Sequence, residues 1–281
     1  MNLSFTKMQG CGNSYLYFNC FSQTIDDPAA LAVRLSDVHF GVGSDGIILI
    51  CPSKVADAKM RIFNADGSES EMCGNGIRCV GKYLYDFGLV QERTQVTVET
   101  LCGIKQLTLY PENGQVRQVR VDMGPAVLTP SAIPCTLPGE RAVSAPLAVL
   151  DKTYAVTCVS MGNPHCVLFP DADVDSLDLA HIGPVFERHP AFPARVNTEF
   201  INVLGPQELK MRVWERGSGE TWACGTGTCA AAVAAVLNRH CPMDTDILVH
   251  LRGGDLTIRY TAETVWMTGP AVRVFDGTVE V

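Results

Sequence analysis

Apolar residues recur every three or four positions in the stretch that follows Cys73. This spacing is the period of one face of a helix. The residues that carry the pattern are Ile77, Val80, Tyr83, Leu84 and Phe87. A glycine-rich run, Gly74-Asn75-Gly76, lies between Cys73 and the first of them. The pattern therefore predicts a helix that begins directly after a cysteine.

Shorter apolar runs bounded by turn residues predict strands elsewhere in the chain. The runs lie at 15–18, 47–50, 96–100, 105–110, 116–121, 166–169, 200–204, 247–251, 256–260 and 265–267. Residues 1–9 and the tail 273–281 are also strand-like, and we expect the tail to pair with the first domain. A second helix is predicted from Asp27-Pro28 to about Ser36, because proline is favoured at the first helical position.

The chain repeats itself at an interval of about 150 residues. Residues 59–63 align without gaps on 210–214, and Cys73-Gly74-Asn75-Gly76 aligns on Cys224-Gly225-Thr226-Gly227, an interval of 224 − 73 = 151. Each half closes on the same tetrapeptide, at 124–127 and at 269–272. The repeat predicts two structurally similar domains related by pseudo-twofold symmetry, 1–124 joined by the strand 270–281, and 125–269.

Composition limits the class of protein. A chain of 281 residues with 47% hydrophobic and 19% charged residues suits a globular protein with two domains. It contains no apolar run long enough to span a membrane and no signal-peptide pattern, so we expect a cytoplasmic protein with no membrane partner. The formal charge of −8 argues against a nucleic-acid partner. The twelve cysteines include no Cys-x-x-Cys pair, so we expect reduced thiols and no metal.

The run Gly41-Val42-Gly43-Ser44-Asp45-Gly46 matches the glycine pattern of dinucleotide-binding proteins. That motif requires a strand before it and a helix after it. Here the predicted order is reversed, since a helix precedes the run and a strand follows it. We interpret the run as a loop without a nucleotide.

A thiol at the start of a helix has a defined chemistry. The first N–H groups of a helix have no partner within the helix, and the helix dipole adds positive charge there. We therefore expect Cys73 to be more acidic than a free thiol, and Gly74 and Asn75 to offer amides to a carboxylate. Two such thiols facing one carbon across the interdomain cleft would suit racemisation or epimerisation. Thiol oxidoreduction is the alternative, although those enzymes usually hold both cysteines in one short motif.

In combination, several motifs resemble those of the diaminopimelate epimerase family. They are the two Cys-Gly-x-Gly turns, Asn64-Ala-Asp-Gly-Ser, Gly162-Asn163-Pro164-His165 and Glu215-Arg216-Gly217. The resemblance covers essentially the whole chain. It implies an α+β fold in which each domain is a mostly antiparallel, barrel-like sheet around a central helix, with the active site in the interdomain cleft. It also implies an isomerase that needs no cofactor, interconverts L,L- and meso-2,6-diaminopimelate, and forms a homodimer.

The resemblance further implies roles for individual residues. Cys73 and Cys224 would be the acid/base pair, and the amides of Gly74, Asn75, Gly225 and Thr226 would bind the reacting carboxylate. The residues implied to hold the substrate are Asn13, Asn64, Asn163, Asn197, Glu215 and Arg216. His165 and Glu215 would tune the pKa of the cysteines. The residue types suit these tasks, because an Arg can bind a second carboxylate with two hydrogen bonds and Asn offers both a donor and acceptors.

Two positions depart from the family pattern. Many members carry a substrate-contacting Gln where this chain has Gly46, and many carry a Tyr at a dimer contact where this chain has Phe275. Other functions remain open at this point. Proline and hydroxyproline racemases also use two cysteine thiols as acid and base. Phenazine-type isomerases share the fold but replace one cysteine by another acid. A thiol redox protein or a diaminopimelate-binding module without catalysis would belong to a different class.

Overall fold

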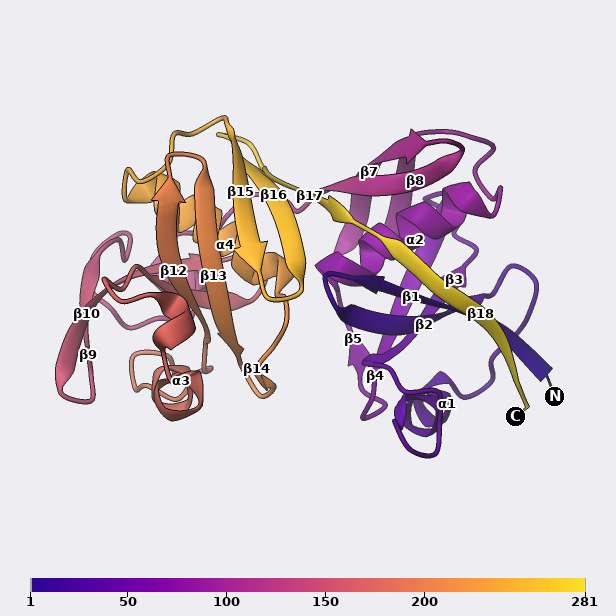
Figure 1. The fold of residues 1–281 in the computed structure, drawn as a ribbon, viewed down its shortest axis with the longest axis horizontal. Coiled ribbons are helices and arrows are strands. Elements are labelled where there is room, and N and C mark those ends of the chain that lie inside the picture. The colour runs from indigo at the N-terminus through magenta and orange to yellow at the C-terminus, as the bar shows by residue number, and fades with distance from the viewer. Residues whose placement is uncertain (1, 281) are drawn as a thin grey trace. The chain divides into compact units, whose positions relative to one another are not determined.

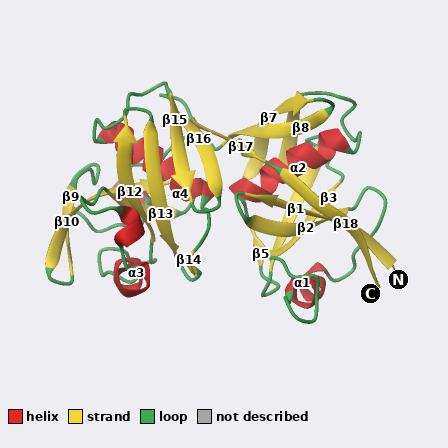
Figure 2. Cartoon of the chain, in the orientation of Figure 1, coloured by secondary structure: helices red, strands yellow, loops and turns green. Residues whose placement is uncertain are grey.

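The computed structural model describes residues 2–280. The chain divides into two compact units, Met1–Asp122 with Thr268–Val281, and Met123–Met267. The strands predicted at 1–9 and 273–281 include residues 1 and 281, which lie outside the described residues. Within 2–280, strands make up most of the regular structure of each unit (Figure 2).

The first unit begins and ends with strands that lie side by side (Figure 1). Its elements are β1 (Asn2–Gly10), β2 (Asn13–Asn19), α1 (Pro28–Ser36), β3 (Gly46–Cys51), β4 (Ala58–Asn64), β5 (Glu69–Ser70), α2 (Gly74–Asp86), β6 (Gln95–Thr100), β7 (Gly103–Glu112), β8 (Gln115–Asp122) and β18 (Val272–Glu280). Strand β18 pairs with β1 antiparallel, so the last strand of the chain belongs to the sheet of the first. Strand β17 (Val265–Pro270) spans the division between the units.

Strand pairing in the first unit runs β18–β1–β2–β3–β4–β6–β7–β8, and β5 pairs with β4. Only β2–β3 and β4–β6 are parallel in this series. Helix α2 packs against β1, β2, β6, β7 and β8, so the sheet surrounds it (Figure 1). Most of its side chains are buried as a result.

The second unit follows the same plan. Its elements are η1 (Pro130–Ala132), β9 (Ala145–Val149), β10 (Lys152–Ser160), β11 (Pro164–Leu168), η2 (Val174–Ser176), α3 (Leu179–Glu187), β12 (Asn197–Gly205), β13 (Glu208–Glu215), β14 (Gly219–Glu220), α4 (Gly225–Leu237), β15 (Asp246–Leu251) and β16 (Gly254–Tyr260). Pairing runs β9–β10–β11–β12–β13–β15–β16, with β11–β12 and β13–β15 parallel. Helix α4 packs against β10, β11, β12, β13, β15 and β16.

The predicted fold class is confirmed in that both units place a central helix within a mostly antiparallel sheet. Small residues let α4 fit this position: ten of its residues are buried, five of them alanines. A helix that is apolar on all sides is a helix enclosed by protein. Helix α3 was not predicted, because Gly183 and Pro184 interrupt its apolar pattern.

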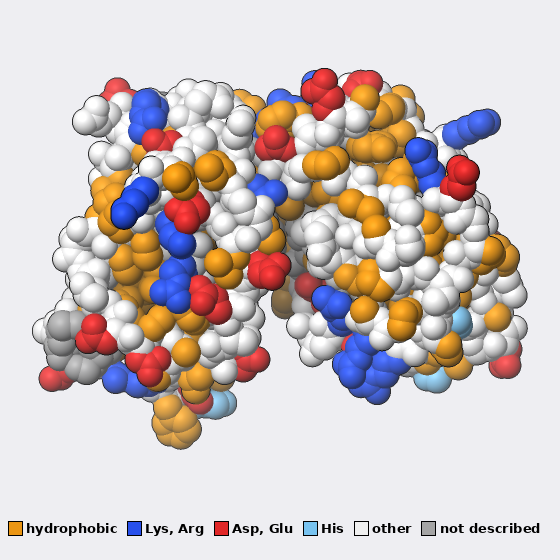
Figure 3. Space-filling model, turned by 180° about the vertical axis from the view of Figure 1, so that it is seen from behind, with side chains coloured by type: hydrophobic (Ala, Val, Ile, Leu, Met, Phe, Trp, Pro, Cys, Tyr) orange, Lys and Arg blue, Asp and Glu red, His pale blue; other side chains and the backbone are white. Residues whose placement is uncertain are grey.

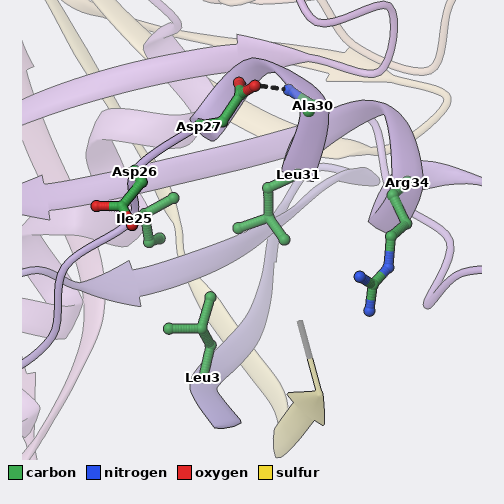
Figure 4. A pocket seen from close by; sticks show the side chains of 7 residues that line it. All are labelled: Leu3, Ile25, Asp26, Asp27, Ala30, Leu31 and Arg34. Carbon is green, nitrogen blue, oxygen red and sulfur yellow. Dashed lines mark hydrogen bonds between the residues drawn. The ribbon is translucent and has the colours of Figure 1, made fainter. Parts of the chain in front are cut away.

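Local signals explain where α1 begins. Asp27 accepts a hydrogen bond from the Ala30 amide at 3.0 Å and Pro28 occupies the first helical position (Figure 4). This is the predicted start, and the helix ends at Ser36 as predicted. Residues 41–45 form a loop before β3, so the interpretation of the glycine pattern as a loop is also confirmed.

Surface properties agree with the composition. On the face drawn in Figure 3, acidic and basic side chains are interspersed with hydrophobic and uncharged ones over both units. Among the described residues, none of the helices has both the length and the apolar character needed to cross a membrane.

Candidate active site

Cys73 is the residue at which helix α2 starts. Its backbone is extended, and its sulfur accepts a hydrogen bond from the Gly76 amide at 3.3 Å. The thiol itself donates to Asn13 Oδ1 at 3.3 Å. The predicted position of Cys73, on a glycine turn that opens a helix, is therefore confirmed, and Asn13 is a direct neighbour of its sulfur.

Asp45 fixes the orientation of Asn13. Asn13 Nδ2 donates to Asp45 Oδ2 at 2.8 Å, and the Ser14 amide donates to the same oxygen at 2.7 Å. Because the amide nitrogen of Asn13 is held by a carboxylate, its oxygen must face the thiol. Asp45 was not predicted as a site residue, although it lies in the glycine-rich loop that drew attention in the sequence.

Gly46, which follows Asp45, accounts for one departure from the family pattern. Its φ is +151°, and a Cβ added here would lie 2.1 Å from the carbonyl oxygen of Phe63. Two backbone segments therefore approach too closely for any side chain. A glutamine, which many family members carry at this position, would not fit here with the backbone in this conformation.

Tyr15 also borders the first thiol. Burial raises the pKa of Tyr15, and the negative charges of Cys73 and Asp45 raise it further. Its hydroxyl is close enough to Asn13 and Cys73 for both side chains to influence this pKa. A phenol in this position stays protonated and can act only as a neutral hydrogen-bonding group. The sequence suggested only a strand residue here.

The remaining predicted residues of the first unit lie at the start of α2 and at the end of β4. Gly74 and Asn75 form its first turn and are buried. Asn64 ends β4 and donates to Ser68 Oγ at 3.0 Å. Arg78 is fully buried and donates to the Gly74 carbonyl at 3.1 Å, an arrangement that the sequence did not predict.

Cys224 has the same position at the start of α4. Its sulfur accepts from the Gly227 amide at 3.4 Å and lies 3.5 Å from Thr226 Oγ1. Burial raises the pKa of this thiol well above its usual value, and the negative charges of Glu215 and Glu199 add to the effect. The acidifying influence of a helix start is therefore outweighed at Cys224, which remains a protonated thiol near neutral pH.

A buried acid lies beside this second thiol. Glu199 Oε1 is 2.7 Å from His165 Nδ1, and both side chains are fully buried. His165 Nε2 lies 3.0 Å from Asn163 Oδ1. His165 and Asn163 were predicted and are brought together, whereas Glu199 was not predicted. The sequence repeat gave no signal for Glu199, because its counterpart in the first unit, 151 residues earlier, is the apolar Ile48.

Asn197 positions the backbone of the next predicted residue. Its side-chain oxygen accepts from the Arg216 amide at 2.8 Å, and its nitrogen donates to the Pro164 carbonyl at 3.2 Å. The guanidinium of Arg216 donates to the Ala194 carbonyl at 3.0 Å and is exposed. Both ends of the Asn197 side chain thus make bonds within the protein.

Glu215 lies next to Arg216 at the end of β13 and accepts a hydrogen bond from the Thr221 hydroxyl. Its negative charge acts on Cys224, as described above. Among the predicted residues of the second unit, the structure therefore joins His165 with Asn163, Asn197 with Arg216, and Glu215 with Cys224.

One well-formed cavity lies outside this set of residues. It has a volume of about 250 Å³ and is bordered by α1 (Figure 4). Its walls are Leu3, Ile25, Asp26, Asp27, Ala30, Leu31 and Arg34. None of the predicted site residues lines it.

Comparison with known proteins identifies the family. A family model described as diaminopimelate epimerase matches residues 5–129 and 157–274. The chain is 55% identical to a diaminopimelate epimerase of Agathobacter rectalis, over 99% of this chain and 100% of that protein. It is 51% identical to the diaminopimelate epimerase of Acetivibrio thermocellus, over 99% of each.

Solved structures agree on the fold. A phenazine biosynthesis protein of Bacillus anthracis has a TM-score of 0.68 at 16% identity, covering 100% of both chains. A hydroxyproline epimerase of Agrobacterium vitis has a TM-score of 0.67 at 16% identity, covering 99% of this chain and 91% of the other. At this identity the likeness extends to the fold alone. The family model and the full-length relatives go further, and by them the chain belongs to the diaminopimelate epimerase family.

Proposed function

We propose that this protein is an isomerase that interconverts L,L- and meso-2,6-diaminopimelate by proton transfer at one α-carbon, without a cofactor. The observation that carries the proposal occurs in both units: in a chain of this family, a cysteine caps the amino-terminal end of each central helix. The reaction belongs to the synthesis of lysine and peptidoglycan precursors, which places the protein in the cytoplasm.

The two cysteines act as acid and base on opposite faces of the α-carbon. One thiolate removes the α-proton, and the other thiol delivers a proton to the other face, so that the configuration inverts. Since the pKa of Cys224 is raised by its buried, acidic surroundings, Cys224 starts as the acid. Cys73, whose thiol donates to Asn13 Oδ1, must lose that proton before it acts as the base.

Charge that develops at the reacting carboxylate is stabilised by backbone amides. The first N–H groups of a helix carry partial positive charge and point out of the helix. Both central helices begin with small residues that allow close approach, Gly74-Asn75 and Gly225-Thr226. Fixed donors of this kind stabilise a transition state without the cost of reorienting solvent.

The other predicted residues bind the rest of the substrate. Arg216 receives the distal carboxylate, and its anchoring to the Ala194 carbonyl holds the guanidinium in place. Asn13, Asn64 and Asn163 contact the substrate directly. Asn197 also holds the Arg216 backbone, through its side-chain oxygen, beside its predicted contact with the substrate. Glu215 and His165 adjust the surroundings of Cys224.

Deuterium incorporation tests the two-base reaction. In heavy water, product formed from either pure epimer should carry deuterium from the first turnover, because its proton comes from a thiol that has exchanged with solvent. Unreacted substrate should stay largely protiated. Retention of the substrate's own proton in early product would contradict the proposal.

Substrate choice and the cysteines are tested in the same assay. The purified protein should epimerise L,L-diaminopimelate but neither L-proline nor L-glutamate. Cys73→Ala and Cys224→Ala should each lower the rate by at least about 10²-fold, since each removes a general acid/base group. A Cys224→Ala protein that epimerises at the wild-type rate would exclude the assigned role.

The proposal includes a homodimer. Strand β18 exposes Val272, Val274 and Phe275, by 42%, 53% and 43%. The Phe275 ring stacks edge-on against Phe5 at 5.9 Å, so the tyrosine of other members is replaced by an aromatic face without a hydroxyl. Analytical ultracentrifugation should give twice the chain mass, and Phe275→Asp should shift the protein to the monomer.

A further inference from the structure

Glu199 is a buried acid whose arrangement is unfavourable for stability. Its side chain is fully buried on β12, and burial raises the pKa of its carboxyl group. Oε1 contacts His165, whereas Oε2 has no hydrogen-bond partner among the described residues. A buried polar atom without a partner costs about 1–3 kcal/mol in protein mutants, so such a residue requires a compensating role.

The first unit provides an internal comparison for this position. Paired strands β2–β3 and β11–β12 are equivalent: Leu16 lies opposite Ile47, and Cys166 lies opposite Thr198. The next residue on β3 is Ile48, and the next on β12 is Glu199. Ile48 is therefore the counterpart of Glu199, at the 151-residue interval that also separates the two cysteines.

The central helices confirm this correspondence. A Cβ added at Gly76 would lie 2.6 Å from Ile48 Cδ1, and a Cβ added at Gly227 would lie 2.5 Å from Glu199 Oε1. The same place beside a cysteine-capped helix is filled by an apolar side chain in one unit and by a carboxyl group in the other. The fold thus accepts an isoleucine here, and packing alone does not explain the acid.

The hydrogen bonds around His165 determine where its protons lie. Asn163 Oδ1 can only accept, so the hydrogen of that bond is on His165 Nε2. The bond between Nδ1 and Glu199 contains one further proton, which is either on the ring or on the carboxyl group. In both cases the pair has no net charge, and in both cases Nε2 is a donor.

We propose, on the basis of the function proposed above, that Glu199 is a positioning residue for substrate binding. By keeping His165 Nε2 protonated, Glu199 holds Asn163 Oδ1 toward the ring. Asn163 Nδ2 then points away from His165 as a hydrogen-bond donor. Asn163 is half-buried, and Nδ2 makes no hydrogen bond within residues 2–280. A donor of this kind suits a carboxylate oxygen of the amino-acid substrate.

Without Glu199, the Nδ1 position loses its partner and the ring can take the other tautomer. Nε2 would then accept from Asn163 Nδ2, and the carboxamide would turn by half a rotation. It would present an oxygen to the carboxylate, and two acceptors repel. Glu199 therefore acts on substrate binding through His165 and Asn163, while its proximity to Cys224 is a separate, electrostatic effect.

Two variants of Glu199 separate positioning from structure. Glu199→Ile copies the first unit and should lower kcat/KM by about 10- to 100-fold, mainly through KM, as expected for loss of a hydrogen bond to a charged group. Its melting temperature should be equal to or above that of the wild type. Glu199→Gln can still donate to Nδ1 and should retain kcat/KM within a few-fold. A purely structural residue would instead show a lower melting temperature and little change in KM.

A double-mutant cycle provides the decisive test. If Glu199 acts through Asn163, the double variant Glu199→Ile/Asn163→Ala should lose no more kcat/KM than Asn163→Ala alone. If the fold-loss of kcat/KM in the double variant equals the product of the losses in the two single variants, the proposal is overturned. Nitrogen-15 spectra of the six histidines should show Nε2 of His165 protonated in the wild type and in Glu199→Gln, and unprotonated in Glu199→Ile.

Failure of this inference is distinguishable from failure of the proposed function. A wild-type protein that does not epimerise diaminopimelate would refute the function. The histidine spectra and melting temperatures would still decide the arrangement of Glu199. An active wild type with multiplicative losses would refute the role of Glu199 alone.

Discussion

The side-chain oxygen of Asn13 lies 3.3 Å from the sulfur of Cys73, and this contact depends on Asp45, which binds the other end of the same carboxamide at 2.8 Å. The two bonds give the amide a fixed direction, with its donor toward the acid and its acceptor toward the thiol. Asp45, in the glycine-rich loop, therefore influences the Cys73 thiol indirectly, by orienting Asn13.

Asp45→Ala should therefore lower kcat/KM by about 2- to 10-fold, the worth of one net hydrogen bond, because Asn13 loses its orientation. Asp45→Asn is the matched control. Both bonds reach a single oxygen of Asp45, and an amide oxygen can accept both. Equal losses in the two variants, measured in the epimerase assay, would contradict an orienting role and point to charge instead.

Gly227→Ala should weaken both activity and stability. The added methyl group would displace Glu199 Oε1, which lies 2.5 Å from the Cβ position, and break its bond to His165. We expect the free energy of unfolding to fall by about 1–3 kcal/mol, as for other overpacked positions. Gly76→Ala is the control, since the atom it displaces, Ile48 Cδ1, makes no hydrogen bond. Urea unfolding of both variants should show the larger loss for Gly227→Ala.

Arg216→Lys should lower kcat/KM for diaminopimelate by about tenfold or more. A guanidinium binds a carboxylate with two parallel bonds while another N–H holds the Ala194 carbonyl, and an ammonium group cannot do both. Substrate saturation curves should show a raised KM. If the lysine variant retains full kcat/KM, the distal carboxylate binds elsewhere.

Outside the candidate active site, Cys51 should be more reactive than the exposed Cys102. A hydrogen bond from Cys20 lowers the pKa of Cys51 to about 7, and the charges of Arg61 and Lys59 assist. The pKa of exposed Cys102 is raised by desolvation and by Glu71. Since the thiolate is the reacting form, iodoacetamide at pH 7 should label Cys51 before Cys102.

Peptide mass spectrometry at increasing reaction times measures that order. Cys20→Ala should slow the labelling of Cys51, because the hydrogen bond that stabilises its thiolate is gone. Labelling of Cys102 ahead of Cys51 would show that access, rather than acidity, controls the reaction.

His250 should make stability depend on pH in the second unit. Hydrogen bonds to Glu208 and Asp255, each at 2.9 Å, raise the pKa of His250 above its usual 6.5. Its stabilising contribution is therefore complete below about pH 6.5 and is lost as the pH rises through the folded-state pKa. The three side chains are partly exposed, so the contribution is at most about 1 kcal/mol. His250→Gln should destabilise the protein at pH 6 and have little effect at pH 9, as measured by urea unfolding.

Much of the site could be predicted from the sequence because it depends on local chain geometry. A cysteine followed by Gly-x-Gly and an apolar helical pattern defines a capped helix start, and both thiols occur there. The asparagines were identified only through the resemblance to a known family, because turns also favour asparagine for purely structural reasons. Asp45, Tyr15 and Glu199 were missed because their roles depend on residues that are distant in the sequence and close in space: Asn13, Cys73 and His165 respectively. On the paired strands β11 and β12, Glu199 lies opposite Val167, and its side chain reaches back to His165, two residues away. No local sequence pattern reports such a contact.

Gly46 and Asn197 show a second limit. A glycine in place of a substrate-binding glutamine looked like a lost contact, and the structure adds that the carbonyl of Phe63 occupies the space. Substrate contact by Asn197 stays a prediction, and the structure adds that each of its two polar atoms also bonds to the backbone. Whether a polar side chain faces a ligand or its own protein is decided by three-dimensional neighbours.

The pairing of β18 with β1 has a consequence for the order of events during synthesis on the ribosome. The strand that completes the first unit is made last, after the whole of the second unit has emerged. Until then β1 has an open edge, and Leu3 and Phe5, which are buried in the finished protein, lack their covering strand. The second unit is continuous in sequence and can fold as soon as it is made. The amino-terminal unit must wait for the last residues of the chain, so the half that is translated first is the half that matures second.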